Sequence, residues 1–339
     1  MYVDIDITQG QQEARARWRT QESGAEFDRK KRQFLTEDAR NFIAQQAMCV
    51  IVGPSPERGP CGLLLTGQPG FVEMPDEYTC IIPVNRCYEA SSFVQGLRVA
   101  SASGMSPQLA LCFLQHTTRQ RICVQGSAEI IPDPFSSEHL FLRLHVHLAF
   151  FHCPKYIRTR LPGLHVPGAS VWSFSNAWEQ DRLTAGVEAF LARQVLCYLC
   201  TIDRQGQCAV NHRGGAAGFL VTLVPDRLTP GGVILLPDYA GNGAFEAIGN
   251  ILETQQAAFL VPGYADQLAL CISGETTVLE PAQLPFFLRQ RCNGAQRIVA
   301  MTVQHVEHQI GDWSAALAYE RARIKLFEDA KQIAYSCQA

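Results

Sequence analysis

The sequence has few of the features that would place a protein in a membrane or on a nucleic acid. No apolar run reaches the roughly 18 residues that span a membrane, and the opening stretch MYVDIDITQGQQEARARWRTQ has no apolar core typical of a signal peptide. The net charge is only −3, and we interpret the one basic block, Arg29-Lys30-Lys31-Arg32, as a solvated helix face. We therefore expect a cytoplasmic protein with neither a membrane nor a nucleic acid as partner.

Metal-binding patterns are also missing. The 13 cysteines are odd in number and scattered, which is typical of small buried side chains in a reducing compartment. Cys197-x-x-Cys200 has no second pair at the spacing of a zinc site. His145, His147 and His152 come close together in the sequence, but no carboxylate or second cysteine is suitably spaced, so we interpret them as residues of a strand. The sequence predicts no metal site.

Signs of nucleophilic catalysis are equally scarce. There is no G-x-S-x-G motif, and no cysteine has an evident activating partner. Apolar residues nevertheless make up 47% of the chain, which is enough for a sizeable core. The sequence thus predicts a globular protein without a recognisable catalytic triad.

What the sequence does contain is an internal repeat. The segments FLTEDARNFIAQQAMCVIV (34–52) and RLTAGVEAFLARQVLCYLC (182–200) share residues at an offset of 148 positions, among them Leu35, Thr36, Phe42, Gln46 and Cys49 of the first segment. Gly126 and Gly274, in two later apolar segments, are separated by the same 148 positions. A constant offset over separate blocks indicates a tandem duplication of a domain of about 150 residues, which is an ordinary domain size.

Each copy shows the same order of expected elements. Thr36 and Thr184 are typical helix N-caps, followed by short helices over 36–46 and 184–194. Several short strands and one more helical stretch follow, so we predict a mainly β fold with α additions (α+β), built from two small barrels. The predicted organisation is an N-terminal extension (1–33), a first barrel (34–163), a linker (164–180), a second barrel (181–312) and a C-terminal helix (313–339).

The motifs of the second copy resemble the pyridoxamine 5′-phosphate oxidase-like family of FMN-binding split barrels. They are NHRGGAAGF (211–219) and PDYAGNGAFEAIGN (237–250). The first copy resembles the same family in LTEDARNFIAQQ and in LRLHVHLAFFHCPKYI (141–157). The resemblance implies two split barrels with FMN in a groove between them. In a duplicated chain the two barrels form an intramolecular pseudo-dimer, present as a monomer or as a homodimer.

The chemistry of these motifs suits a flavin phosphate. Arg213 offers a planar set of donors, and Gly214 and Gly215 let a ligand approach the backbone. Asn242 lies near an expected helix start, where anions are favoured, and amide side chains such as that of Asn250 can bind flavin oxygens. The expected cofactor-binding residues are Arg213, Gly214, Gly215, Asp238, Asn242, Gly243, Asn250 and Lys155.

The first copy is expected to have lost its own FMN site. Leu65 occupies the position equivalent to Arg213, and an aliphatic side chain cannot bind a phosphate. The first copy instead retains the segment that the resemblance brings near the partner barrel, with His152 and Lys155. We therefore expect one composite site per chain, although a turn lysine exposed to solvent is an equal alternative for Lys155. His212 and His152 are the candidate proton donors.

The sequence leaves three functions open. The first is an FMN-dependent oxidoreductase acting on a small molecule, with NAD(P)H or the substrate as electron donor and oxygen as a conceivable acceptor. The second is a non-enzymatic flavin or haem binder, since nine histidines leave room for an axial ligand. The third is an interaction scaffold without a cofactor.

Overall fold

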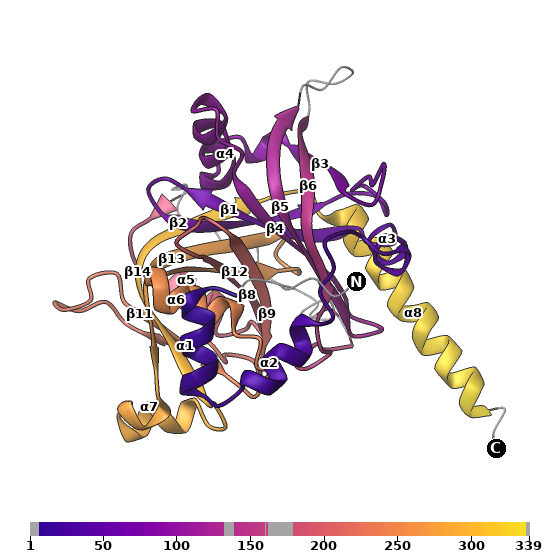
Figure 1. Cartoon of the computed structure of the whole chain (residues 1–339). Helices are drawn as coiled ribbons and strands as arrows, with labels where there is room; N and C mark the ends of the chain where they lie inside the picture. The colour runs from indigo at the N-terminus through magenta and orange to yellow at the C-terminus, as the bar shows by residue number, and fades with distance from the viewer. Residues whose placement is uncertain (1–6, 132–138, 160, 162–178, 337–339) are drawn as a thin grey trace.

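The computed structural model describes residues 7–131, 139–159, 161 and 179–336, and these form two antiparallel sheets with helices around them (Figure 1). The first sheet has six strands in the order β2-β1-β4-β5-β6-β3. Its strands are β1 (Met48–Ser55), β2 (Gly59–Thr66), β3 (Thr79–Asn85), β4 (Gln108–Gln115), β5 (Gln120–Ile131) and β6 (His139–Phe151). Helices α3 (Glu37–Ile43) and α4 (Ser92–Ala102) belong to the same half of the chain as this sheet.

The second sheet repeats this strand order with two additional strands, β10 and β7. Its order is β10-β11-β14-β13-β12-β8-β9, with the short β7 paired to β14. Its strands are β7 (Glu179–Gln180), β8 (Leu196–Ile202), β9 (Cys208–Gly214), β10 (Val221–Leu223), β11 (Val233–Asp238), β12 (Gln256–Gly263), β13 (Leu268–Leu279) and β14 (Arg297–Ile310). Its helices are α5 (Ala185–Leu191), α6 (Glu246–Thr254) and α7 (Phe286–Arg291). The predicted fold class, two related barrels of mainly β structure in one chain, is confirmed.

A shared β-bulge shows how closely the halves correspond. The pairing of β5 with β6 shifts register at Gly126, and that of β13 with β14 shifts at Gly274. A Cβ atom at Gly126 would overlap the carbonyl oxygen of His145, and one at Gly274 would overlap that of Thr302. Only glycine lets the backbones approach this closely, which explains why both copies carry it at the same offset.

The predicted helix starts are confirmed as well. The hydroxyl of Thr36 accepts a hydrogen bond from the Ala39 amide, and that of Thr184 accepts one from the Val187 amide. Each bond satisfies an amide that has no partner inside its helix. The helices expected over 36–46 and 184–194 correspond to α3 and α5, but α7 and the full length of β6 and β14 were not predicted.

The two sheets pack directly on each other. β2 of the first half lies against β12 and β8 of the second, and one hydrophobic core extends through both halves. At this contact the backbone amide of Gly62 donates to the sulfur of Cys271 over 3.4 Å. The described cysteines are free thiols and most are buried, as expected for small apolar side chains. Burial raises the pKa of the Cys271 thiol to about 12, so it stays protonated and inert.

The N-terminal extension folds into two helices, α1 (Gln9–Arg17) and α2 (Gln21–Asp28), that lie beside α6 (Figure 1). The interpretation of the basic block as a solvated face is wrong for Lys31, whose side chain is only 2% exposed. Its ammonium group lies 3.3 Å from Asp28 and 2.9 Å from Glu246. Burial alone would lower the pKa of Lys31, but the charges of Glu246 and Asp28 outweigh it and raise the pKa.

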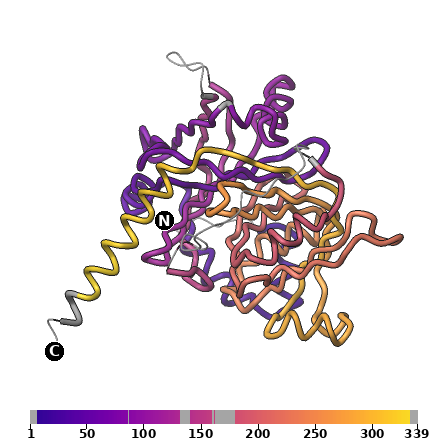
Figure 2. Tube along the Cα trace, turned by 180° about the vertical axis from the view of Figure 1, so that it is seen from behind, coloured from indigo at the N-terminus to yellow at the C-terminus, as the bar shows by residue number. Residues whose placement is uncertain are grey.

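The C-terminal helix α8 (Ser314–Ser336) extends away from the body of the molecule (Figure 2). It is anchored by the buried Trp313, and the side chains of Tyr319 and Arg323 donate to the carbonyl oxygen of Gln45. Of the predicted linker, only Glu179 and Gln180 fall among the described residues, in β7. No helix in the described part of the chain is both long and apolar enough to cross a membrane.

Candidate functional site

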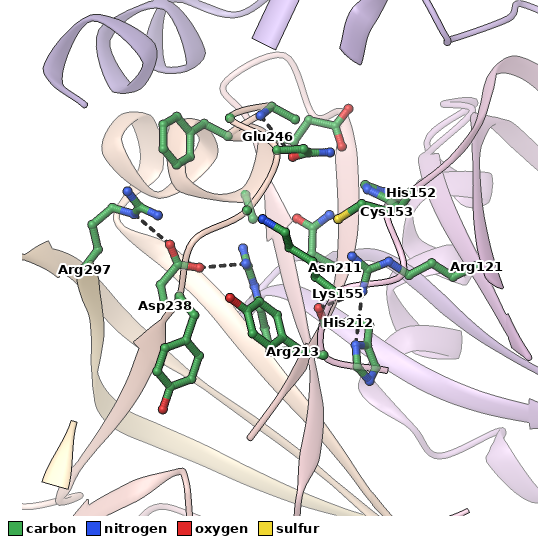
Figure 3. A pocket seen from close by; sticks show the side chains of 18 residues that line it. Arg121, His152, Cys153, Lys155, Asn211, His212, Arg213, Asp238, Glu246 and Arg297 are labelled. Carbon is green, nitrogen blue, oxygen red and sulfur yellow. Dashed lines mark hydrogen bonds and ion pairs between the residues drawn. The ribbon is translucent and has the colours of Figure 1, made fainter. Parts of the chain in front are cut away.

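A cavity of about 70 Å³ lies at the junction of the two halves (Figure 3). β5 and the chain after β6 supply the first-half side, while β9, β11, β14, the first turn of α6 and the loop before it supply the second-half side. We call it the junction cavity. Seven of the residues singled out from the sequence line it, namely His152, Lys155, His212, Arg213, Asp238, Asn242 and Gly243. The expected combination of first-half and second-half residues is therefore present in one place.

A buried carboxylate joins two arginines at one end of this cavity. Asp238, 2% exposed, receives Nη1 of Arg213 at 2.7 Å on one oxygen and Nε of Arg297 at 2.7 Å on the other. Arg297 stands directly opposite Asp238 in the pairing of β11 with β14. Arg213 is thus held in place by an ion pair while its Nε remains without a hydrogen-bond partner. No sequence motif marks Arg297, which begins a strand whose full length was not predicted.

A second unexpected cation, Arg121, comes from β5 of the first half. Its side chain is buried, and its Nη1 lies 3.2 Å from the carbonyl oxygen and 3.1 Å from Nδ1 of His212. Its Nε has no hydrogen-bond partner, and no carboxylate among the described residues forms an ion pair with it. A buried charge without an opposite charge is costly. The junction cavity is therefore suited to an anion.

The two imidazoles of the cavity are held in the neutral form. Burial, followed by the positive charges of Arg121, Lys31 and Arg213, lowers the pKa of His152 well below 6.5. Burial and the charge of Arg121 do the same to the pKa of His212. The ring of His152 is stacked on Phe27 of α2, with centroids 5.4 Å apart. Nε2 of each histidine has no hydrogen-bond partner in the described structure.

The wall opposite these histidines is the loop that leads into α6. The first turn of that helix, at Glu246 and Ala247, lines the cavity, so part of the positive end of the helix faces it. Nζ of Lys155 lies 3.4 Å from the carbonyl oxygen of Ala240, and the Tyr156 hydroxyl donates to the same oxygen over 2.9 Å. These two bonds fasten the first-half chain to the second-half loop.

Three other residues predicted from the sequence do not line the cavity. Gly214 of the second half lies directly against Tyr156 of the first half. A Cβ atom at Gly214 would be only 2.5 Å from the carbonyl oxygen of Tyr156. The carbonyl of Gly215 accepts a hydrogen bond from Arg158 over 2.7 Å. The amide group of Asn250 donates to Thr201 over 3.1 Å, and Asn250 lines a neighbouring cavity. The structure gives the two glycines contacts between halves and Asn250 a contact within its own half.

The N-terminal extension binds the loop before α6 and the start of α6, which form one wall of the junction cavity. The guanidinium of the buried Arg15 donates to the carbonyl of Ala244 over 3.1 and 3.3 Å and pairs with Asp28 at 2.7 Å. Lys31 holds Glu246 at the start of α6 by the ion pair described above. The position of the loop and of the first turn of α6 therefore depends on residues that the sequence places in an extension outside both barrels.

The register of the two sheets identifies the first-half counterparts of the ionic network. Arg213 pairs with Cys197 as Leu65 pairs with Cys49, at an offset of 148. Asp238 faces Arg297 as Val84 faces Leu140, at the corresponding places of β11–β14 and β3–β6. Aliphatic residues thus replace all three charged ones. The first half has no equivalent of the Arg213–Asp238–Arg297 network, in agreement with the expected loss of its phosphate site.

No family model matches the sequence, and no curated protein matches it. Solved protein structures, in contrast, match this chain. One is a putative pyridoxamine 5′-phosphate oxidase from Lactobacillus delbrueckii, 18% identical over 38% of this chain and 94% of that chain, with a TM-score of 0.29. HupZ from Group A Streptococcus is 11% identical over 36% of this chain and 90% of that one, with a TM-score of 0.28. HutZ, the haem storage protein of Vibrio cholerae, is 12% identical over 38% of this chain and 97% of that one, with a TM-score of 0.24.

Likeness at these identities is one of fold. The strand order and the bulge described above are shared by the two halves, as expected for two related barrels in one chain.

Proposed function

We propose that the junction cavity, at about 70 Å³, binds only the phosphate end of flavin mononucleotide while the flavin ring lies outside it, and that the protein is an FMN-dependent oxidoreductase acting on a small molecule. The observation that carries this proposal is the buried guanidinium of Arg121, which has no carboxylate partner among the described residues. Arg213, Lys155 and the first turn of α6 add positive potential around the same space. A phosphate dianion is the natural complement of such a group of donors.

Unsatisfied atoms around the cavity support the fit to a phosphate. The donors among them are Nε of Arg121, Nε of Arg213, Nε2 of His152 and Nε2 of His212, all buried and without hydrogen-bond partners among the described residues, and the one acceptor is Oδ1 of Asp238, which is in an ion pair with Arg213. Buried polar atoms in proteins nearly always have a partner. A phosphate offers three acceptor oxygens, which is what this concentration of donors requires.

Each lining residue has a separate task in this proposal. Arg213, fixed by Asp238, and Lys155, fixed by Ala240, hold the ligand from opposite halves. The bound flavin supplies the redox chemistry. Because arginine can only donate, Nδ1 of His212 accepts from Arg121, and its proton must be on Nε2. His212 can therefore donate a hydrogen bond without carrying a charge.

The proposal also predicts proton uptake on binding. Cations lower the pKa values of both cavity histidines, and a dianion placed among them offsets that effect. The change in the number of protons bound should appear as a dependence of affinity on pH. NAD(P)H or the substrate remains the proposed electron donor, with oxygen as a conceivable acceptor.

The first test is the visible spectrum of the purified protein and a titration with FMN and with riboflavin. We expect one FMN per chain and at least tenfold weaker binding of riboflavin, which has no phosphate. Arg213→Leu, which copies the first half, should weaken FMN binding by tenfold or more. The control Arg143→Gln removes an exposed arginine of β6 and should leave the affinity unchanged. Equal affinity for both flavins, or no effect of Arg213→Leu, would contradict the proposal.

Bleaching of the bound flavin by NAD(P)H under anaerobic conditions then distinguishes a reductase from a carrier. Rapid bleaching supports an enzyme that takes electrons from a nicotinamide. A flavin that no reductant or substrate candidate bleaches would point instead to a non-enzymatic flavin binder.

One observation favours a second candidate, haem binding. A neutral imidazole with a free Nε2 is the form in which histidine ligates iron, and His152 is such an imidazole at the junction cavity. Cationic residues such as Lys155 would suit the carboxylates of a haem. A Soret band on addition of haem, lost in His152→Ala and with no flavin absorbance, would support this candidate over the first.

A further inference from the structure

A second cavity, of about 390 Å³, lies in the first half at the place equivalent to the junction cavity. Three of its lining residues are the counterparts of residues that line the junction cavity, by the register of the sheets and by counting on from β6 and β14. Leu65 corresponds to Arg213, Asn85 to Tyr239, and Asp312 to Lys155. We call it the mirror cavity.

We propose that the mirror cavity is a separate binding site for a small aromatic molecule that carries a positively charged amine. Nothing in this inference depends on whether the junction cavity binds FMN. It rests on the size of the mirror cavity, on the apolar side chains that line it, and on the sign of its charges.

The size fits a small molecule. Ligand sites in proteins usually measure from about 300 to 1,000 Å³, and the mirror cavity falls in that range with 390 Å³. The junction cavity, at about 70 Å³, is much smaller. Replacing the long charged side chains of one site by shorter aliphatic ones leaves this additional space.

Half of the lining residues are apolar or aromatic. The network of Arg213, Asp238 and Arg297 is replaced by aliphatic side chains, of which Leu65 faces the mirror cavity. Aromatic and aliphatic side chains from four segments complete the wall, namely Phe71, Ile81, Pro83, Tyr88 and Phe141. Tyr88 is fixed from behind, because its hydroxyl accepts a hydrogen bond from the indole of the buried Trp313 over 3.3 Å.

The charge at the mirror cavity is opposite to that at the junction cavity. Lys155 has the acidic counterpart Asp312, and Glu73 adds a second carboxylate. No lysine or arginine is found among the residues that the structure assigns to this lining. Carboxylates attract a cation, and aromatic faces such as that of Tyr88 add to the attraction. An anion meets repulsion at the same place.

Three probes with one aromatic body separate the effect of charge from that of size. They are 2-naphthylmethylamine, which is a cation at neutral pH, the neutral 2-naphthalenemethanol, and the anion 2-naphthoate. Isothermal titration calorimetry on the full chain should give at least tenfold tighter binding of the amine than of the carboxylate, with the alcohol between them. Equal binding of all three, preference for the carboxylate or alcohol, or no binding at millimolar concentration would overturn the proposal.

Two conservative variants locate the binding. Asp312→Asn and Glu73→Gln should each weaken the binding of the amine by a factor of three or more. The binding of the alcohol should stay unchanged. Both side chains are exposed, so folding is not at risk. Glu22→Gln is the matched control. It removes an exposed carboxylate of α2 that is distant in the sequence from both Glu73 and Asp312. Unchanged amine binding in both variants would assign the amine to another site and overturn the proposal.

Saturating FMN should not displace the amine, because the two cavities have no lining residue in common. If FMN fails to bind at all, the amine result still stands, so the two proposals fail separately. Direct competition between FMN and the amine would contradict the assignment to the mirror cavity.

Discussion

Nη1 of Arg121 lies 3.1 Å from Nδ1 of His212, and this contact joins β5 of the first half to β9 of the second. A cation placed against an imidazole prevents its protonation, which is why burial and Arg121 together lower the pKa of His212. The junction cavity thus combines a cation without a carboxylate partner among the described residues and two neutral histidines. After burial, the charge of Arg121 is the largest cause of the low pKa values of both histidines.

Replacing Arg121 by methionine should change both properties at once. The variant keeps an unbranched apolar side chain and removes the charge, so the pKa values of His152 and His212 should rise toward 6.5. Binding of FMN or of inorganic phosphate should weaken by tenfold or more. Histidine NMR titrations and calorimetry measure the two effects. Arg121→Lys, which keeps the charge, should retain low histidine pKa values. Unchanged titrations in Arg121→Met would refute the electrostatic role.

Asp238→Asn should destabilise the second half. The substitution leaves Arg213 and the buried Arg297 without their shared carboxylate, and breaking a buried ion pair by removing one partner costs about 3–5 kcal/mol. Urea unfolding measures this loss. Asp181→Asn, which breaks the exposed pair with Arg182, is the matched control and should leave the unfolding midpoint unchanged. A similar midpoint for both variants would show that the network contributes little to stability.

Lys31→Met should loosen the N-terminal extension. The ammonium group lies between Asp28 and Glu246 in a buried position, so its removal leaves Glu246 without this ion pair and Asp28 paired with Arg15 alone. We expect a loss of about 3 kcal/mol and faster proteolytic cleavage before residue 31. Lys30→Met removes the exposed neighbour of Lys31 and serves as the control. Partial recovery in the double variant Lys31→Met/Glu246→Gln would identify the ion pair as the cause, whereas cleavage at the wild-type rate would exclude it.

Stability should fall as the pH drops below 6.5. Burial lowers the pKa of His116 from 6.5 to about 4, despite its bond to the carbonyl of Arg158. The unfolded chain therefore binds a proton in this window that the folded chain does not, and stability is lost as pH falls from 6.5 toward 4, by on the order of 3 kcal/mol in total. Chemical unfolding at several pH values measures the slope.

His116→Gln should reduce that slope, while His145→Gln, on the exposed face of β6, should not. His152 and His212 have lowered pKa values of the same sign, so part of the slope will remain in His116→Gln. A slope identical to that of the wild type would refute the contribution of His116.

Much of the fold could be predicted from local sequence features. Thr36 and Thr184 cap helices with their own hydroxyls, a purely local interaction. Gly126 and Gly274 stand out in the repeat because the bulge tolerates no Cβ. Such features are legible in one sequence because a single residue, together with its immediate neighbours, determines each of them.

The roles of the cations around the junction cavity could not be predicted from local sequence features. Arg297 gains its role from Asp238, 59 positions away, through the pairing of two strands. Lys31 looks like part of a solvated basic block, and its nearest carboxylate partner, Glu246, is 215 positions away. Arg121 lies in an apolar strand with no motif around it. Long-range partners decide the function of each of these charges, and a sequence without an alignment does not reveal them.

Joining the halves in one polypeptide releases them from the constraint of symmetry. In a dimer of identical chains, every substitution alters both equivalent pockets at once. Here a lysine stands at position 155 and an aspartate at the equivalent position 312, an arrangement that no symmetric pair could hold. Each pocket is free to change its chemistry while its twin keeps its own.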